Sequence, residues 1–347
     1  MPAAKTDQGG KPTINDVAAL ADCSKKTVSR VINGSPGLSP ATKERVEQAI
    51  RDLGYVPNPQ ARALAFGRNL AIALLHDNPN AQTVLNFERG VLDAIRASDL
   101  ALMVRPVDRN SPDLLGDIEG FLQRQRPLGV MLLPPISERD DIAELCRALG
   151  VRYVRVGSTL LDDGEHCVAS IDWQAVAQAC QVLIANGHRA IGFVRGPHGF
   201  RSAAERELGF DTAMNQAGIE VPANYRAQGD YRFESGRIAG RSLLSLSNPP
   251  SAIFASNDEM AAGVMHAALE RGLRIPQDLS LIGFDDSPTA QHLYPSLTTV
   301  RWPIKDMGVL AAEKLVGEYL GKRRFSADVH ELQSELIQRA SVAQAAN

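Results

Sequence analysis

The chain has 347 residues, of which 44% are hydrophobic and 22% charged, and its formal net charge is −3. This length fits about two or three domains, and the composition is that of a soluble protein with packed cores. No apolar run approaches the roughly 20 residues of a membrane helix, and residues 1–10 lack the apolar stretch of a signal peptide. These features predict a cytoplasmic protein with no membrane partner.

Two classes of chemistry are disfavoured by the sequence. The cysteines lie far apart and form no C-x-x-C pair, so neither a zinc site nor a disulfide framework is indicated. Neither G-x-G-x-x-G nor G-x-x-x-x-G-K-[ST] opens a helix after a strand, which argues against a nucleotide-binding enzyme. We therefore expect no metal, no cofactor and no enzymatic activity.

Positive charge is concentrated at the N-terminal end. Residues 1–68 hold ten Lys and Arg against six Asp and Glu, whereas the remainder holds 27 against 34. A basic segment on an acidic body predicts that this end meets a polyanion. A charge excess of this size is also common on solvated faces, so this alternative stays open.

Residues 13–56 show the pattern of three short helices, the first two joined by a tight turn. Each helix has the cap residues expected at its ends. These caps are Thr13 with Asp16 for the first helix, Ser24 for the second, and Ser39, Pro40 and Gly54 for the third. The pattern predicts an all-α domain over residues 13–56, preceded by a disordered lead over residues 1–12.

The second of these helices has the composition of a recognition helix. A helix-turn-helix places its second helix in the DNA major groove, with residues near the N-terminus of that helix at base edges. Lys and Arg donate to guanine, and Ser and Thr suit phosphates or either base. The polar side of the helix carries Lys25, Lys26, Ser29 and Arg30. Spacing alone leaves open a three-helix module whose basic face is only solvated.

From Leu70 onward, short apolar runs alternate with amphipathic segments. This alternation predicts parallel sheets covered by helices on both faces. About 270 residues are too many for one small open sheet, so we expect two α/β lobes. The expected strands include 70–75, 101–104, 129–133, 153–156, 190–194, 252–255 and 279–284, and the expected helices include 84–97, 173–185, 201–217, 233–246 and 259–271.

Two such lobes bind small molecules in the cleft at the carboxyl ends of their strands. A sugar site needs planar hydrogen-bonding groups and an aromatic face. Candidates at strand ends are Asp77, Asn80, Asp172, Trp173, Asn257 and Asp285. An Asp at such a position, Asp258 above all, could equally cap the following helix. Arg155 interrupts an apolar run, and it either forms a structural ion pair or faces the ligand.

The sequence resembles the LacI/GalR family of transcriptional repressors. The segments that carry the resemblance to the family's DNA-binding headpiece are 13–18, 27–34 and 53–58, which read TINDVA, TVSRVING and LGYVPN. It continues more sparsely through 186–191, 257–258, 283–286 and 297–300, and covers residues 13–340. The resemblance implies a helix-turn-helix headpiece followed by a two-lobed, periplasmic-binding-protein-like α/β body.

The resemblance further implies that residues 57–68 form a hinge that becomes helical only on operator DNA, in a dimer. Leu64 matches the leucine that wedges into the minor groove. So short a helix is unstable alone in water, and unstacking by a wedge is repaid by a bent duplex. The implied DNA-binding residues are Thr13, Ser24, Lys25, Lys26, Thr27, Ser29, Arg30, Asn33, Tyr55, Asn58, Arg62 and Leu64.

Effector contacts are also implied by the resemblance. Arg206 matches the family's sugar-clamping arginine, and Tyr231 falls where an aromatic ring often stacks on the ligand. Asn257 and Asp285 match residues that hold hydroxyls. Trp302 departs from a polar residue found at that position elsewhere in the family, which suggests a different or larger ligand, or ring stacking. The first-lobe contacts match poorly, and Asp77, Asn80, Arg155, Asp172 and Trp173 complete the candidate set.

The domain order predicted from the resemblance is interrupted, because the chain returns to the first lobe for a helix over 304–320 and crosses again for a strand within 328–339. The first effector-binding lobe takes residues 69–171 and 301–322, and the second takes 172–300 and 323–347. No leucine heptads occur in 340–347, so we expect a homodimer. The predicted function is a repressor of a carbohydrate-use operon, released from palindromic double-stranded operator DNA by a sugar or oligosaccharide, and nucleoid-associated when bound. A ligand that promotes DNA binding, an activator, and a solute-binding protein without DNA function remain as alternatives.

Overall fold

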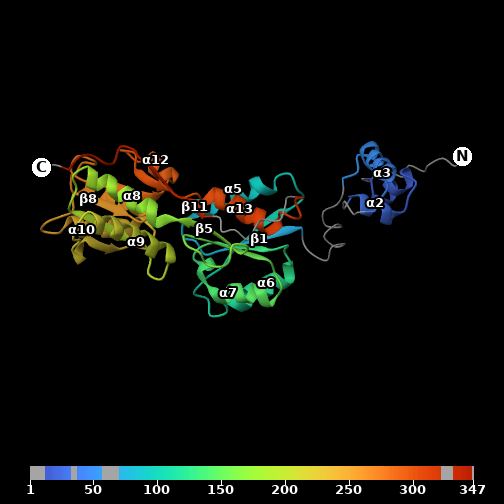
Figure 1. Cartoon of the computed structure of the whole chain (residues 1–347), viewed down its shortest axis with the longest axis horizontal. Coiled ribbons are helices and arrows are strands. Elements are labelled where there is room, and N and C mark those ends of the chain that lie inside the picture. The colour runs from blue at the N-terminus through green and yellow to red at the C-terminus, as the bar shows by residue number, and fades with distance from the viewer. Residues whose placement is uncertain (1–11, 33–36, 57–69, 322–330, 346–347) are drawn as a thin grey trace. The chain divides into compact units, whose positions relative to one another are not determined.

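The computed structural model describes residues 12–32, 37–56, 70–321 and 331–345. The chain divides into two compact units, Met1–Leu70 and Ala71–Asn347, and each is described by itself (Figure 1). The predicted hinge over residues 57–68 and the predicted lead, apart from Pro12, lie outside the described residues.

The first unit consists of three helices: α1 (Ile14–Leu20), α2 (Lys25–Ile32) and α3 (Pro40–Leu53). The predicted caps are confirmed by hydrogen bonds. The backbone N–H of Thr13 donates to the Asp16 carboxylate at 2.8 Å, and the Ser39 hydroxyl accepts from the N–H of Thr42 at 3.2 Å. Gly54 ends α3 with φ 59°, a left-handed conformation that glycine adopts without strain. Apolar residues from all three helices form one core: Val17, Ala18, Ala21, Val28, Val31, Val46 and Ala49.

The second unit contains two six-stranded sheets, one in each lobe (Figure 1). All strands of the first sheet are parallel, in the order β11-β5-β4-β3-β1-β2. Their bounds are β1 (Ala71–His76), β2 (Ala101–Pro106), β3 (Val130–Leu132), β4 (Tyr153–Gly157), β5 (Cys167–Ile171) and β11 (Glu331–Gln333). The central strands are apolar and buried, as expected for a parallel sheet covered on both faces.

The second sheet has the order β12-β10-β9-β8-β6-β7 and is parallel except for β12, which runs antiparallel to β10. Its strands are β6 (Ile191–Arg195), β7 (Arg226–Gln228), β8 (Ala252–Ala255), β9 (Ser280–Asp285), β10 (Thr298–Arg301) and β12 (Glu335–Ile337). The predicted fold class, a helical headpiece with a two-lobed α/β body, is confirmed.

Helices cover both faces of each sheet. In the first lobe α5 (Ala81–Ile95) and α13 (Ile304–Val316) lie on one face, and α6 (Leu114–Gln125) and α7 (Asp140–Ala148) on the other (Figure 1). The helices α5 and α13 cross so closely that a Cβ on Gly90 would lie 1.9 Å from the backbone oxygen of Lys305. Only glycine therefore fits at this crossing. Short helical turns are η1 (Ile136–Glu138), η2 (Ala223–Tyr225) and α12 (Pro288–His292).

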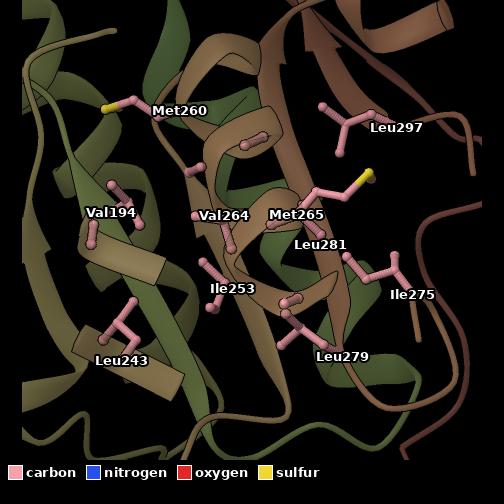
Figure 2. Packing of buried hydrophobic residues seen from close by; sticks show 14 of the residues in the cluster. Val194, Leu243, Ile253, Met260, Val264, Met265, Ile275, Leu279, Leu281 and Leu297 are labelled. Carbon is pink, nitrogen blue, oxygen red and sulfur yellow. The ribbon is translucent and has the colours of Figure 1, made fainter. Parts of the chain in front are cut away.

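In the second lobe α10 (Phe233–Leu244) and α11 (Asp258–Glu270) pack on the face that carries Val194 and Ile253 (Figure 2). On the opposite face, Phe210 of α9 (Arg201–Gln216) stacks on Phe193 of β6 with ring centroids 4.7 Å apart. The helix α8 (Asp172–Ala185) packs beside α9. Each sheet therefore presents the carboxyl ends of its parallel strands, with the loops that follow them, at one edge.

One predicted boundary is wrong. Residues 323–347 were expected in the second lobe, but β11 pairs in parallel with β5 of the first sheet, and only β12 joins the second. The single strand predicted within residues 328–339 is accordingly two strands, divided at Ser334. The local pattern cannot distinguish these cases, because the sheet that a short strand joins is decided by its neighbours. The other two crossings between lobes fall at 171–172 and 301–304.

All four cysteines are free thiols, and three of them are buried. Burial raises the pKa of the Cys146 thiol to about 12, so this group stays protonated at neutral pH. Among the described residues, no helix combines the length and apolar character needed to cross a membrane.

Candidate functional site

The start of α2 presents a polar, basic face. Lys25, Lys26 and Arg30 are exposed, whereas Val28 and Val31 are buried in the headpiece core. The two lysines lie in the first turn of the helix, which is where a recognition helix meets base edges. This face therefore offers ammonium and guanidinium donors from a rigid element.

Two other predicted DNA contacts, Ser24 and Thr13, form hydrogen bonds that cap the starts of helices. The Ser24 hydroxyl accepts from the backbone N–H of Thr27 at 3.1 Å and lies 2.9 Å from the Thr27 hydroxyl. Thr13 is bonded to Asp16 in the same way at the start of α1. Tyr55 is half-buried against the headpiece core, and Ser29 is half-buried on α2. The predicted contacts Asn33, Asn58, Arg62 and Leu64 lie outside the described residues.

A small cavity lies between the two lobes at the strand ends; we call it the ligand cavity. Residues that sequence reasoning proposed and that line it are Asn80, Arg206, Tyr231, Asn257, Asp285 and Trp302. Residues that it missed are Asn78, Pro79, Thr83, Pro134, Phe200 and Ser202. The cavity volume is about 30 Å³. A volume of this size holds a water or two, so a sugar requires the lobes to separate before it enters.

Arg206 is the buried cation of the ligand cavity. Its Nη1 donates to the backbone oxygen of Ser256 at 2.5 Å, and its guanidinium carbon lies 3.7 Å from the centre of the Phe284 ring. Its Nη2 is 3.8 Å from Asp285. The Nε has no hydrogen-bond partner among the described residues. The planar group is thus fixed by its surroundings while one buried N–H stays available to a ligand hydroxyl.

Negative charge outweighs this one arginine. Asp172 lies 3.7 Å from Arg206, and the Asp258 carboxylate lies beside Gly283 of β9. Burial raises the pKa of Asp285 to about 7, because the attraction of Arg206 only partly offsets it and the charge of Asp172 adds to it. Burial, and then the charge of Asp285, raises the pKa of Asp258 to about 8. Such perturbed carboxyl groups are typical of functional sites.

The cap alternative for Asp258 is settled by its neighbour. Asn257 is the N-cap of α11, where its side-chain oxygen accepts from the N–H of Met260 at 2.9 Å. Asp258 instead accepts from the Thr299 hydroxyl at 2.6 Å and from the Ser287 N–H at 2.7 Å. It therefore ties the loop that follows β9 to strand β10.

The cavity is closed by direct contact between the lobes. Asn80, which follows β1 and caps α5, donates through Nδ2 to Asp285 Oδ2 at 3.2 Å. Asp285 and Tyr231 both have positive φ, 114° and 69°, a region that residues other than glycine seldom adopt. Backbone strain of this kind persists only where the surroundings enforce it, and it clusters at ligand-binding sites.

Four predicted contacts do not line the ligand cavity. Asp77 pairs with Arg109 at 3.4 Å. Arg155 is buried and donates to Asp140 at 2.8 Å and to two backbone oxygens, so the ion-pair alternative fits it. Asp172 stands behind Arg206, and Trp173 lines a different cavity.

A hydrogen bond to Ser170 fixes the orientation of Trp302. Its indole Nε1 donates to the Ser170 hydroxyl at 2.9 Å, and that hydroxyl donates to Asp172 at 2.8 Å. The ring therefore has a fixed orientation in the cavity wall, which suits stacking against a ligand ring.

One group of potential metal ligands occurs among the described residues, at the edge of the first lobe. Ligand atoms of Asp162, Asp163 and His166 lie within 4.8 Å of one another. The Asp163 carboxylate is already bonded to the His166 ring at 2.8 Å, and Asp162 accepts from the Tyr153 hydroxyl at 2.8 Å. These bonds explain the cluster without an ion.

Comparison with known proteins identifies both units. Residues 13–58 match the family model of bacterial regulatory proteins, lacI family, and residues 180–342 match the periplasmic binding protein-like domain. The probable HTH-type transcriptional repressor ExuR of Bacillus subtilis is 34% identical over 310 residues, which cover 88% of this chain and 90% of the relative. Its similarity runs through the headpiece and both lobes.

Solved structures give the same result. The complex of the transcriptional regulator CelR with cellobiose is 33% identical, covers 95% of this chain and 99% of its own, and has a TM-score of 0.69. The Lac repressor dimer bound to operator and the anti-inducer ONPF is 25% identical, covers 96% and 100%, and has a TM-score of 0.77. The chain belongs to the LacI family of bacterial regulatory proteins.

Proposed function

We propose that this chain is a dimeric, sequence-specific transcriptional repressor that a sugar or oligosaccharide releases from a palindromic operator. The single observation that carries the proposal is that a lacI-family headpiece is joined to a two-lobed unit whose cleft collects hydroxyl-binding groups. Relatives of comparable length are repressors, and solved neighbours hold cellobiose or operator DNA. The protein acts by binding, without a catalytic step, in the cytoplasm and on the nucleoid.

The DNA-binding residues of this proposal are the exposed face of α2 together with the residues of the hinge. Lys25 and Lys26 read base edges, and Arg30 contacts a base or a phosphate. Residues 57–68 form the hinge, and Leu64 is the wedge. Two headpieces related by a two-fold axis then read half-sites about one helical turn apart.

The effector side of the proposal assigns roles within the ligand cavity. Asp285 and Asn257 hold hydroxyls, Arg206 donates through its unpartnered Nε, and Trp302 and Tyr231 present aromatic rings. A sugar hydroxyl replaces Asn80 as the partner of Asp285, because the Asn80–Asp285 bond occupies that acceptor in the closed cleft. The effect on DNA follows from the difference in ligand affinity between the two arrangements of the lobes.

The test begins with selection of binding sites from a randomised duplex library by the full chain. We expect enrichment of a pseudo-palindrome, whose binding is then followed by fluorescence anisotropy during titration with mono- and disaccharides. Release by a sugar supports the repressor mechanism, and tighter binding would replace it with co-repression. Failure to enrich any sequence over a scrambled duplex would overturn the regulator assignment itself.

A further inference from the structure

A second cavity lies where the lobes join, and we call it the crossing cavity. Its volume is about 380 Å³, which falls within the range of roughly 300–1,000 Å³ seen for small-molecule sites. Its first-lobe wall comes from β5, β11 and the loop after β4, and its second-lobe wall from the first halves of α8 and α9. Among the residues that the structure describes, it shares no lining residue with the ligand cavity.

The charge of the crossing cavity is negative. Glu205 of α9 and Glu331 of β11 line it from opposite lobes, and none of its described lining residues is Lys, Arg or His. Glu205 is half-buried, and its pKa is raised by burial and then by the charge of Asp172 behind it. None of the described residues that line the cavity supplies a cation to neutralise these carboxylates, so a positively charged ligand gains most from entering.

The rest of the wall supplies an aromatic ring, apolar surface and a spare hydroxyl. Trp173 is half-buried at the cavity, and Leu160 and Leu208 are 44% and 50% exposed there. The Ser158 side chain is 2% exposed, yet its hydroxyl has no hydrogen-bond partner among the described residues. A cation is stabilised over the face of an indole ring, and a buried hydroxyl without a partner can form a hydrogen bond to a ligand.

We infer that the crossing cavity binds a small primary ammonium compound, with the ammonium group held between Glu205 and Glu331 and the carbon skeleton against Trp173. Both lobes supply the wall, so the affinity of the cavity depends on how the lobes are arranged. An occupant therefore shifts the same equilibrium that the sugar shifts. This regulatory step rests on the proposed function, whereas the binding step does not.

The test measures binding to the full chain by calorimetry, with a matched pair of probes that are not sugars. Putrescine is compared with 1,4-butanediol, because the two compounds differ only by their ammonium and hydroxyl groups. We expect the amine to bind and high salt to weaken its binding. Glu205→Gln and Glu331→Gln keep the shape of the wall and should each weaken amine binding about tenfold. Glu220→Gln removes an exposed acid outside the cavity and should change nothing.

Three results would overturn the inference: no amine binding, equal binding of the neutral partner, or unchanged affinity in both cavity variants. Amine binding that persists in Asp285→Asn supports a site separate from the ligand cavity, and its loss there would reassign the amine to that cavity. Saturation with amine that leaves operator affinity unchanged would overturn the regulatory step. Operator selection and the sugar response are measured separately, so failure here is distinguishable from failure of the proposed function.

Discussion

Replacing Asp285 by Asn should stabilise the protein while it weakens the sugar response. The side chain keeps its shape, and an amide oxygen can still accept from Asn80, which donates at 3.2 Å in the wild type. The substitution removes one of several buried negative charges that lie near a single arginine, Arg206. A carboxylate that binds a sugar hydroxyl contributes a charge-assisted bond, and its loss costs about 1.5–3 kcal/mol of affinity, or about 10- to 100-fold.

The stability gain depends on pH in a defined direction. Burial raises the pKa of Asp285 from 3.8 to about 7. A carboxyl group with a raised pKa stabilises the fold in its protonated form, so the wild type loses stability as the pH rises through the window between these two values. The difference is about 3 pH units, which corresponds to about 4 kcal/mol at 1.36 kcal/mol per unit as an order of magnitude. Asn does not titrate, so the variant keeps this stability above neutral pH.

The assay is urea unfolding of both proteins at about pH 5 and about pH 8, together with sugar titration of operator binding. Asp285→Asn should gain more stability over the wild type at the higher pH. Asp286→Asn is the matched control, because Asp286 pairs with Arg301 at 2.8 Å and with Arg339, and the loss of these ion pairs should destabilise. A stability difference for Asp285→Asn that is the same at both pH values, or a normal sugar response, would refute the reasoning.

Three further changes test the two ends of the mechanism. Lys26→Ala should cost about 1–3 kcal/mol of operator affinity and relax the preference at one base pair per half-site in competition binding; Lys43→Ala, on α3 and paired with Glu47 at 3.7 Å, is the control. An equal loss on all sequences would instead make Lys26 a phosphate contact. Leu64→Gly should leave sugar binding intact while operator affinity, measured by anisotropy, falls toward the non-specific level; tight, inducible binding in that variant would rule out the wedge. Trp302→Phe keeps an aromatic ring but loses the hydrogen bond to Ser170. Sugar affinity should therefore change less than the sugar-dependent shift in operator binding. A normal shift in operator binding would show that this hydrogen bond does not couple the two sites.

The cores and caps were predictable because they depend on local pattern. Runs of buried apolar residues such as 252–255 and 279–284 match β8 and β9 within a residue or two. Strand β7 (Arg226–Gln228) was missed because it is a short, polar edge strand whose existence depends on pairing with β6. Strand β5 was missed too, although it is buried, because its run of five residues includes Ser170. Pairing of this kind is tertiary information.

The ligand cavity was partly predictable, because the local pattern also shows where strands end. Asp285 ends β9, and Asn257 and Asn80 lie in the short segments after β8 and β1, so their place at the sheet edge follows from strand order alone. Trp173 was assigned to the cleft with Asp172, yet successive residues on a helix point about 100° apart, and only Asp172 faces Arg206. Phe200, in the loop after β6, and Ser202, in the first turn of α9, were missed because nothing in the local sequence marks which residues there turn inward.

The contacts between the lobes are of two physical kinds, and the difference indicates how a ligand moves them. At the crossings, the fully buried Asp172 accepts from Ser170 at 2.8 Å and from Ser334 at 3.1 Å, so it ties two chain crossings together. Breaking these bonds without water would leave buried polar groups unpaired, at a cost of about 1–3 kcal/mol each.

Across the mouth of the cleft, by contrast, the Glu138 carboxylate accepts from the N–H of Arg201 at 3.0 Å, and the Arg109 guanidinium lies 4.6 Å from the Phe200 ring. Arg201 is exposed, so water can replace its partner as the lobes part. We therefore expect the crossings to act as the pivot and the cleft contacts to exchange. In the proposed mechanism, a sugar that substitutes its own hydroxyls for the Asn80–Asp285 bond changes the separation of the lobes at the cleft while the pivot keeps its bonds.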